Sequence, residues 1–316
     1  MDIYTQQQIR ASLNLEEAAS RVAEGFVAYT QGLVQVPPVQ SFQFATRNGD
    51  CCVKSAWILE DELFSVRISS GFYDNPAKGL PSNDGLTLLI SAHTGRPVAM
   101  LRDEGWLTSM RTALAGQIVA RVMAPTHVTG IGIVGTGTQA RMQLEHLMPV
   151  TECRSVTVFG RDPQRLKGYR EFAETLGFKV TTTEDAAVVA MNANLIVTTT
   201  ASREAILMSD WVRPGTHITA LGADGYGKQE LDVQLVARAD VIVVDSADQC
   251  IKFGEIARAV ASRLIEETNL VALGSVLSGE RRGRLNDRQI TIADLTGLGV
   301  QDTQIAKCAV TACSRH

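Results

Sequence analysis

The sequence has no long hydrophobic run, no metal-ligand spacing and no strong excess of charge of either sign. No apolar run approaches the roughly 20 residues that a helix needs to cross a bilayer. The formal net charge of the 316 residues is −4, which gives no electrostatic footprint for nucleic acid or an anionic membrane. The first residues are polar and acidic, unlike a secretory signal peptide. These features predict a cytoplasmic protein with neither nucleic-acid nor membrane partners.

Cysteine and histidine occur without the patterns typical of metal sites or disulfide frameworks. The six cysteines include the adjacent pair Cys51 and Cys52, which does not suit an ordinary disulfide framework. The five histidines form no H-x-x-x-H or similar pair. We therefore expect reduced thiols and no metal site.

Between residues 129 and 150 the sequence contains a strand, a glycine-rich turn and a helix in direct succession. The run GIGIV suits a buried parallel strand, and from Ala140 onward the apolar residues follow a helical period. Gly135 permits the turn, Gly137 lets a pyrophosphate approach the backbone, and the small Ala140 lets the helix pack close to the strand. The free N–H groups at the helix start then face the anion. The segment predicts a dinucleotide site formed by Gly135, Thr136, Gly137, Thr138, Gln139 and Ala140, the alternative being a purely structural turn.

Strands and helices alternate after this motif, whereas strands dominate before it. Residues 6–32 predict a helix that is broken by Pro37-Pro38, and residues 42–90 predict several strands. A last helix is expected to start near Asp302 and to return to the first domain. The alternation after the motif implies a parallel sheet with right-handed crossovers. Its expected strands cover 155–160, 179–183, 194–200, 216–222 and 240–246.

The end of the second strand of this sheet bears on the choice between NAD and NADP. An acid there would bind the ribose 2′-hydroxyl, whereas an Arg suits a 2′-phosphate. Gly160 stands where the acid would normally be, and Arg161 follows it. Asp162 is assigned either to the cofactor site or to the N-cap of the next helix. The sequence favours NADPH, and the alternative is that Arg161 is a solvated turn residue and NADH is used.

Four cations and one acid are further candidates for the chemistry. Lys54, Arg67 and Lys78 lie in the strand-rich region, and Arg111 lies on the helix that follows it. Lys54 and Arg67 alternate with apolar neighbours, so both could point toward the same cleft, although an Arg in a strand is most often on a solvated face. Asp224 comes just after an expected strand, at the edge where open α/β sheets bind ligands. A carboxylate there can contact an amine or iminium, and the alternative is a turn Asp before Gly.

Six ordered segments resemble the ornithine cyclodeaminase/mu-crystallin family, over the chain from about residue 50 to 310. The resemblance implies an α/β fold: a Rossmann NAD(P)-binding domain at 121–301 and a discontinuous α+β substrate-binding and dimerisation domain formed by 1–120 and 302–316. It also implies a homodimer that passes a hydride between nicotinamide and C2 of an amino or imino acid. The segments are GFYDNPAKGLPSNDG (71–85), LTSMRTA (107–113), VGTGTQA (134–140), GADGYGKQELD (222–232), VVDSADQC…GE (243–255) and DLTGLGVQD (294–302).

The resemblance assigns roles to individual residues. Arg111 matches the family's Arg that binds the substrate carboxylate, and Asp224 matches its catalytic Asp at the substrate nitrogen. Two positions depart from the cyclodeaminase pattern: Arg67 replaces a Lys, and Val39 stands where an Arg is usual. Lys54 could supply the missing charge. An Arg remains protonated at any working pH, so it is a poor proton shuttle, and the change weakens the prediction of ornithine cyclisation.

The sequence therefore predicts an NAD(P)-dependent oxidoreductase that acts on CH–NH, CH–NH2 or C=N groups in amino-acid metabolism. The expected reaction is reduction of a small α-imino acid (a ketimine, cyclic imine or iminosuccinate-like compound) to the L-amino acid, reversible as an amino-acid dehydrogenase. The number of cations hints at a dicarboxylic substrate such as iminosuccinate. The alternatives are an ornithine cyclodeaminase, which keeps NAD bound and releases ammonia, and a non-enzymatic ligand-binding protein. The residues assigned are Asp224 and Arg67 for catalysis, Lys54, Arg111 and Lys78 for substrate, and Thr112, Thr199 and Thr200 as further cofactor contacts.

Overall fold

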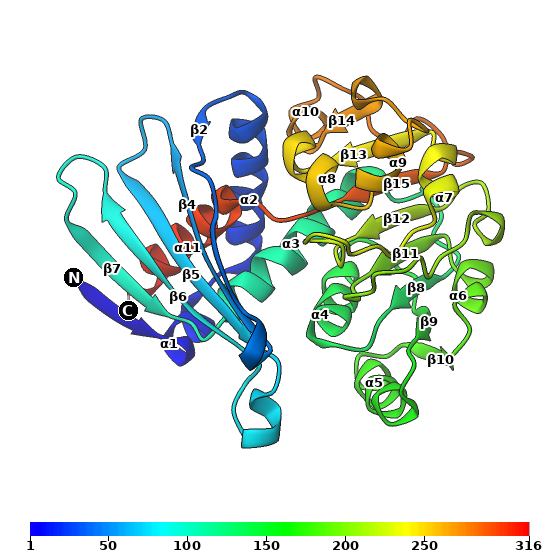
Figure 1. Cartoon of the computed structure of the whole chain (residues 1–316), viewed down its shortest axis with the longest axis horizontal. Helices are drawn as coiled ribbons and strands as arrows, with labels where there is room; N and C mark the ends of the chain where they lie inside the picture. Colours follow the sequence, from blue (N-terminus) through cyan, green and yellow to red (C-terminus); the bar gives the residue numbers. More distant parts are fainter. Residues whose placement is uncertain (316) are drawn as a thin grey trace. The chain divides into compact units, whose positions relative to one another are not determined.

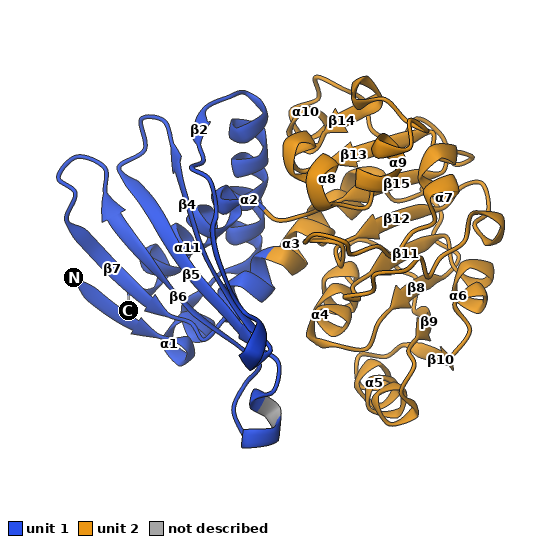
Figure 2. Cartoon of the chain, viewed as in Figure 1, with its two compact units in different colours: residues 1–111, 298–316 blue, residues 112–297 orange. Residues whose placement is uncertain are grey.

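The computed structural model describes residues 1–315, apart from the side chain of Pro76. The chain forms two compact units, one of residues 1–111 and 298–316 (unit 1) and one of residues 112–297 (unit 2), shown in Figure 2. The chain leaves unit 1 within helix α3 (Trp106–Met123) and re-enters it just before α11 (Gly299–Cys313). The C-terminal helix thus belongs to the first unit.

Unit 2 is built on an eight-stranded sheet whose paired strands are all parallel, in the order β10-β9-β8-β11-β12-β15-β13-β14 (Figure 1). Its strands are β8 (Ile131–Val134), β9 (Ser155–Phe159), β10 (Lys179–Thr183), β11 (Leu195–Thr198), β12 (His217–Ala220), β13 (Val241–Val244), β14 (Leu270–Ala272) and β15 (Thr291–Asp294). Its helices after α3 are α4 (Thr138–Leu147), α5 (Pro163–Thr175), α6 (Ala186–Asn192), α7 (Val233–Arg238), α8 (Ala247–Phe253), α9 (Ala257–Ala261) and α10 (Leu273–Leu277). The five strands predicted after the glycine motif are all present.

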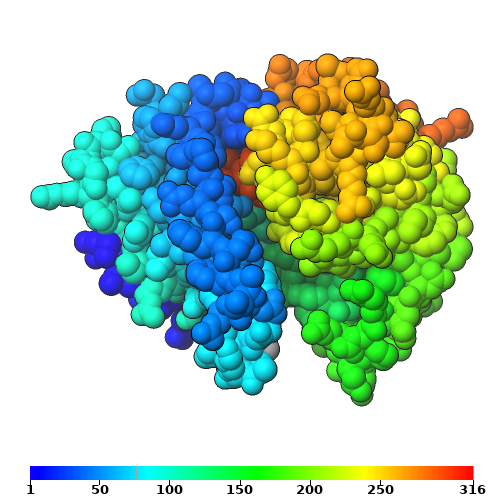
Figure 3. All heavy atoms as spheres, in the orientation of Figure 1, coloured from blue at the N-terminus to red at the C-terminus, as the bar shows by residue number. Residues whose placement is uncertain are grey.

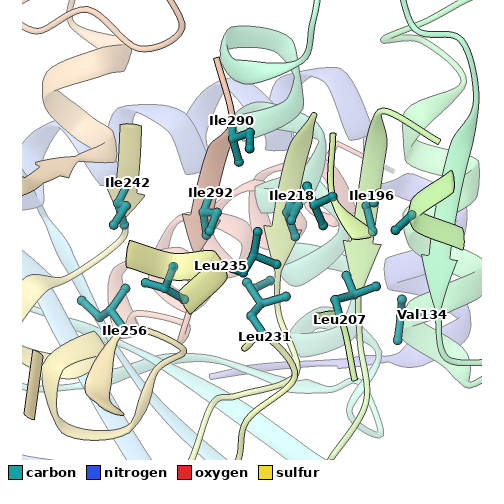
Figure 4. Close-up of a cluster of buried hydrophobic side chains, with 14 of the residues drawn as sticks. Val134, Ile196, Leu207, Ile218, Leu231, Leu235, Ile242, Ile256, Ile290 and Ile292 are labelled. Carbon is teal, nitrogen blue, oxygen red and sulfur yellow. The ribbon is translucent and has the colours of Figure 1, made fainter. Parts of the chain in front are cut away.

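The core of unit 2 explains why its strands are apolar on both faces. A continuous cluster of buried aliphatic side chains runs across strands β8, β11, β12, β13 and β15 and includes residues from helices α6 and α7 (Figure 4). Parallel strands covered by helices on both faces bury side chains in both directions, so the sequence shows short hydrophobic runs rather than alternation. The members drawn and labelled are Val134, Ile196, Leu207, Ile218, Leu231, Leu235, Ile242, Ile256, Ile290 and Ile292.

Two strands of unit 2 were not predicted. β14 is three residues long, and β15 comes from the segment TIAD, which carries polar residues at both ends. β15 lies between β12 and β13, although it follows both in the sequence. Its partners are therefore distant in the chain, and a four-residue pattern is too short to reveal it.

Unit 1 contains a seven-stranded sheet with the order β1-β7-β6-β5-β4-β2, in which β3 also pairs with β4. Helix α11 packs against α2 and against strands β4 and β5 of this unit. The strands are β1 (Asp2–Thr5), β2 (Val34–Gln35), β3 (Gln40–Phe44), β4 (Gly49–Ile58), β5 (Leu63–Phe72), β6 (Asn83–Ser91) and β7 (Pro97–Arg102). The helices are α1 (Gln6–Ser12) and α2 (Leu15–Thr30), and short 3-10 turns are η1 (Ala45–Arg47) and η2 (Asn75–Lys78).

The helix predicted at residues 6–32 is in fact two helices, α1 and α2. The chain leaves the helical conformation at Leu13 and Asn14, and the Asn14 side chain accepts a hydrogen bond from the N–H of Glu17 at 3.0 Å. Asn14 is thus the N-cap of α2, and it separates this helix from α1. The six cysteines are free thiols. None of the helices in residues 1–315 is long and apolar enough to cross a membrane.

Candidate functional site

The turn between β8 and α4 depends on Gly135. Its φ of +120° lies in a region that residues other than glycine rarely adopt, and a Cβ there would lie 2.6 Å from Thr199 Oγ1. Its N–H donates to the carbonyl of Phe159 at 3.0 Å, which ties the turn to the end of β9. Ala140 lies on the buried face of α4 and is 0 % exposed, so a larger residue there would have to displace its neighbours. The glycine and the alanine are thus required by the backbone and by packing, respectively.

Gly137 differs from Gly135 because nothing in the protein requires its lack of a side chain. It is the N-cap of α4 with a φ of −80°, and no heavy atom lies within 4 Å of a Cβ built there. The first intrahelical bond runs from the N–H of Arg141 to the carbonyl of Gly137, so the N–H groups of residues 138–140 precede it. An open approach to the N–H groups of a helix start fits a phosphate. The residues of this turn therefore fit a dinucleotide.

The end of β9 carries a glycine where an acid would select NAD. A Cβ at Gly160 would lie 2.7 Å from Thr136 Cγ2, so a side chain there would have to displace this methyl group. Asp162 is the N-cap of α5 and accepts from the N–H of Gln164 at 2.9 Å. Arg161 is exposed. Asp162 thus serves the helix, which was the alternative to a cofactor contact, whereas Arg161 remains available to solvent or to a ligand.

Thr199 and Thr200 follow β11 at the edge of the sheet where ligands bind. The N–H and the hydroxyl of Thr199 both donate to the carbonyl of Val134, at 3.0 and 3.1 Å, which fixes the end of β11 against β8. The N–H of Thr200 donates to Glu230 Oε1 at 2.6 Å. Thr112, on α3, accepts from Gln143 Nε2 through its carbonyl at 3.0 Å. These contacts position all three threonines, and their contact with a cofactor stays a prediction.

Glu230 is a buried acid that the sequence did not single out. Its Oε2 accepts from the N–H of Gly222 at 3.0 Å, so the carboxylate joins the segments that follow β11 and β12. Burial raises the pKa of Glu230 to about 7. The Glu255 carboxylate accepts from the N–H groups of Glu230 and Leu231 at 2.7 and 2.9 Å, and burial raises its pKa well above the usual range. The only sequence signal was the position of Glu230 in the segment GADGYGKQELD.

Asp224 lies two residues beyond Gly222 in the segment that follows β12. Its side chain is 52 % exposed, and Lys228 Nζ lies 2.5 Å from its Oδ1. The carboxylate is therefore accessible at the carboxyl edge of the sheet, paired with a flexible cation. This placement suits a group that contacts a ligand nitrogen, and the catalytic role stays a prediction.

Arg67 is buried in unit 1 and paired with an acid. It lies directly opposite Lys54 in the antiparallel pair β4–β5, so the two side chains share one face of the sheet. Arg67 Nη1 lies 2.5 Å from Asp103 Oδ1, and the two side chains are 2 % and 0 % exposed. Arg67 also donates to the hydroxyls of Ser69 and Thr87, each at 3.0 Å. Burial raises the pKa of Asp103, and the Arg67 charge opposes this increase.

One nitrogen of Arg67, Nη2, is buried and has no hydrogen-bond partner among the described residues. A Cβ at Gly85 would lie 2.8 Å from Nη2 and 2.5 Å from the carbonyl oxygen of Ile68, so the guanidinium group packs closely over a glycine. A buried N–H group without a protein partner is costly and calls for an acceptor on a water or a ligand. A carboxylate oxygen is one acceptor that suits Arg67.

Arg111 is held in a similar way by residues of α11. Its Nε donates to Asp302 Oδ1 and its Nη1 to Gln301 Oε1, both at 3.1 Å. Asp103 and Asp302 thus balance the charges of Arg67 and Arg111, so the number of cations by itself no longer favours a dicarboxylic substrate. Lys78 lies on η2 and is exposed. The sequence did not identify Asp103 or Asp302 as a partner of these arginines.

Known proteins resemble this chain over nearly its whole length. The family model described as "Ornithine cyclodeaminase/mu-crystallin family" matches residues 1–313. An archaeal alanine dehydrogenase dimer with bound NAD superposes with a TM-score of 0.92 at 34 % identity, covering 100 % of this chain and 96 % of that one. The Δ1-pyrroline-2-carboxylate reductase of Thermococcus litoralis, in complex with NADH and L-proline, has a TM-score of 0.92 at 28 % identity, covering 100 % and 98 %. The iminosuccinate reductase of Paracoccus denitrificans with NAD+ has the same score and identity, covering 100 % and 97 %. The chain belongs to the ornithine cyclodeaminase/mu-crystallin family.

Proposed function

We propose that this protein is an NAD(P)H-dependent reductase of small α-imino acids, giving the L-amino acid and reversible as an amino-acid dehydrogenase. The observation that carries the proposal is the β8–α4 turn, where Gly137 is open to a ligand although the protein around it does not require a glycine. The three similar structures are named as enzymes of amino and imino acids, and all are named with NAD, NADH or NAD+. A bound nicotinamide would supply or accept the hydride.

In this proposal the residues of the chain bind and orient the substrate. Arg67 and Arg111, with Lys54, hold its carboxylate, and the pairing with Asp103 and Asp302 fixes the two guanidinium groups in place. Asp224 contacts the substrate nitrogen, whose charge changes as the hydride is transferred. Reduction of an iminium that is already protonated needs positioning and charge stabilisation, which a fixed guanidinium provides.

We further propose that NADPH is preferred over NADH. The proposal is supported by the exposed Arg161 and by Gly160, which stands where an acid that binds a ribose hydroxyl would be expected. A guanidinium group can bind a 2′-phosphate through two parallel hydrogen bonds.

We also propose a homodimer formed through unit 1. Every residue of β3 is exposed, including Phe42 and Phe44, and exposed aliphatic side chains lie on the segment before it. Figure 3 shows this part of the chain (blue) at the surface. An exposed apolar strip of this kind is typical of an interface, and the alanine dehydrogenase above is named as a dimer.

Phe42→Glu should convert the dimer to monomer. Leu285 is an exposed apolar residue of unit 2, and Leu285→Glu should leave the dimer intact. Light scattering on both variants measures this, and a dimeric Phe42→Glu protein would contradict the assignment of the surface. The exposed apolar residues of the strip are Leu33, Val36, Val39, Phe42 and Phe44.

The alternative is an ornithine cyclodeaminase, which the family's name includes. The buried pair of Arg67 with Asp103 argues against it, because a permanently protonated Arg is a poor proton shuttle for the loss of ammonia. Cofactor turnover separates the two reactions. A reductase consumes NAD(P)H, whereas a cyclodeaminase releases ammonia from ornithine with no net change in nicotinamide absorbance.

The test is a screen of 2-oxo acids with ammonia or methylamine, and of cyclic imines, against NADH and NADPH. We expect oxidation of NAD(P)H with at least one imino acid and none with the 2-oxo acid alone. Ammonia release from ornithine without nicotinamide consumption would instead favour the cyclodeaminase. The absence of both activities would contradict the proposed chemistry.

A further inference from the structure

Glu230 joins two segments at the edge of the sheet in unit 2 where ligands bind. We propose that Glu230 is a positioning residue for the reaction, which sets the place of Asp224 by fastening the segment after β12 to the segment after β11. The inference rests on the proposed function, in which Asp224 contacts the substrate nitrogen. It adds a residue that neither touches substrate nor belongs to the glycine turn.

The two oxygens of the Glu230 carboxylate have different partners. Oε1 accepts from the N–H of Thr200 at 2.6 Å, and Oε2 accepts from the N–H of Gly222 at 3.0 Å. Thr200 and Gly222 follow adjacent parallel strands, β11 and β12, at their carboxyl ends. Glu230 therefore bridges two neighbouring segments at the edge where open α/β sheets bind ligands.

Packing around Gly222 leaves this bridge no freedom. A Cβ at Gly222 would lie 2.3 Å from Glu230 Oε2 and 2.1 Å from the carbonyl oxygen of Thr200. The three residues thus interlock, and a side chain at position 222 would push the two segments apart. The bridge therefore requires glycine at position 222.

The backbone of Glu230 is itself fixed on both sides. Its N–H donates to Glu255 Oε1 at 2.7 Å, and its carbonyl accepts from the N–H groups of Ile206 and Leu207 at 2.7 and 3.0 Å. The neighbouring N–H of Gln229 donates to the carbonyl of Ser202 at 2.8 Å. A residue held this firmly can transmit a fixed position to the segments that it joins.

Asp224, by contrast, has little support of its own. It lies two residues after Gly222, its side chain is half exposed, and it is paired with Lys228, which is also partly exposed. An exposed ion pair holds a side chain only weakly. The position of Asp224 therefore depends on the bridge at Gly222, and so on Glu230.

The chemistry of a carboxylate is specific to this task. A carboxylate offers acceptors on both oxygens, whereas the amide of Gln offers one acceptor and one donor group. In Glu230→Gln the NH2 group must face one of the two backbone N–H groups, so one bond is lost and two donors oppose each other. The described contacts of Glu230 include no cation, so removing its charge also removes a desolvation cost. Glu230→Gln should therefore fold, while its two segments are joined less firmly.

The experiment compares Glu230→Gln with Asp185→Asn, a control that makes the same change from carboxylate to amide elsewhere in unit 2. The Asp185 carboxylate accepts from the N–H of Ala187 at the start of α6 and has no contact with Thr200, Gly222 or Glu255 among its described hydrogen bonds. In the full-length Glu230→Gln enzyme we expect kcat to fall about 10-fold or more, because a misplacement of 1 Å can cost about 10²-fold. KM for the imino acid should change less than about 3-fold, because other residues bind the carboxylate. Hydrogen exchange should become faster at residues 199–204 and 221–229, and Asp185→Asn should change neither kcat nor this exchange.

The outcomes separate this inference from the proposed function. A Glu230→Gln enzyme with normal kcat and normal exchange would overturn the positioning role and leave the reductase assignment intact. A loss of activity no larger than the loss of folded protein would also overturn it, because Glu230 would then have a merely structural role. A wild-type protein that reduces no imino acid would contradict the proposed function, and the exchange measurement would still test the bridge.

Discussion

Gly137→Val tests the dinucleotide site without disturbing the protein around it. No heavy atom lies within 4 Å of a Cβ at this position, and the φ of −80° is open to any residue. The cost to folding should therefore be that of a poor N-cap, about 1 kcal/mol or less. A branched side chain would, however, occupy the approach to the N–H groups of residues 138–140. Hydrogen bonds to a charged group contribute about 1.5–3 kcal/mol each, so the loss of two should weaken binding by about 3 kcal/mol or more.

This loss corresponds to a rise of about 10²-fold or more in Kd for NAD(P)H, measured by calorimetry. The matched control is Gly168→Val on α5, where the nearest atom to a new Cβ, Arg141 Nη2, lies at an ordinary contact distance of 3.6 Å. The control should bind the cofactor normally, and both variants should unfold close to the wild-type temperature. Unchanged affinity in a folded Gly137→Val protein would refute the placement of the pyrophosphate at this turn.

Three further changes test the other assignments. Arg161→Ala should lower kcat/KM for NADPH by about 10-fold or more, the effect of one hydrogen bond to a charged group, and change it little for NADH. A wild-type enzyme that prefers NADH would show that the interpretation of this strand end is wrong. Asp224→Asn should lower kcat by about 10²-fold with cofactor affinity intact, and a near-normal kcat would make Asp224 a turn residue only. Glu230 should make stability pH-dependent: burial raises its folded pKa to about 7 from the ordinary value of 4.5, so the native state keeps a proton that the unfolded state releases. The free energy of unfolding should therefore fall as pH rises from about 4.5 to about 7. Denaturation experiments at pH 5 and pH 8 should show a smaller fall for Glu230→Gln than for the wild type.

The sequence revealed the parts of the site that are local in the chain. The turn from β8 to α4 was predicted because one short segment contains the strand, the glycines and the helix start. Strand alternation likewise indicated that Lys54 and Arg67 could point the same way, and the structure adds that they lie opposite each other in the β4–β5 pair. In each case the signal lies in spacing along a few residues, which backbone geometry converts directly into position.

The acids that complete the site were not accessible in this way. Asp103 lies 36 residues from Arg67, Asp302 lies 191 residues from Arg111, and Glu230 lies 30 residues from Thr200. Tertiary folding creates these pairs, and no periodic pattern marks them. β15 was missed for the same reason, because it enters the sheet between strands that precede it.

The central claim is that a hydride passes from the nicotinamide to C2 of an imino acid and is consumed in each turnover. The most direct measurement uses NAD(P)H deuterated at C4, on each face in turn, with the best imino acid from the screen. The account predicts one equivalent of deuterium at C2 of the product for one equivalent of cofactor oxidised, from one face only. Product without deuterium from either face, or ammonia release with no cofactor oxidised, would contradict it.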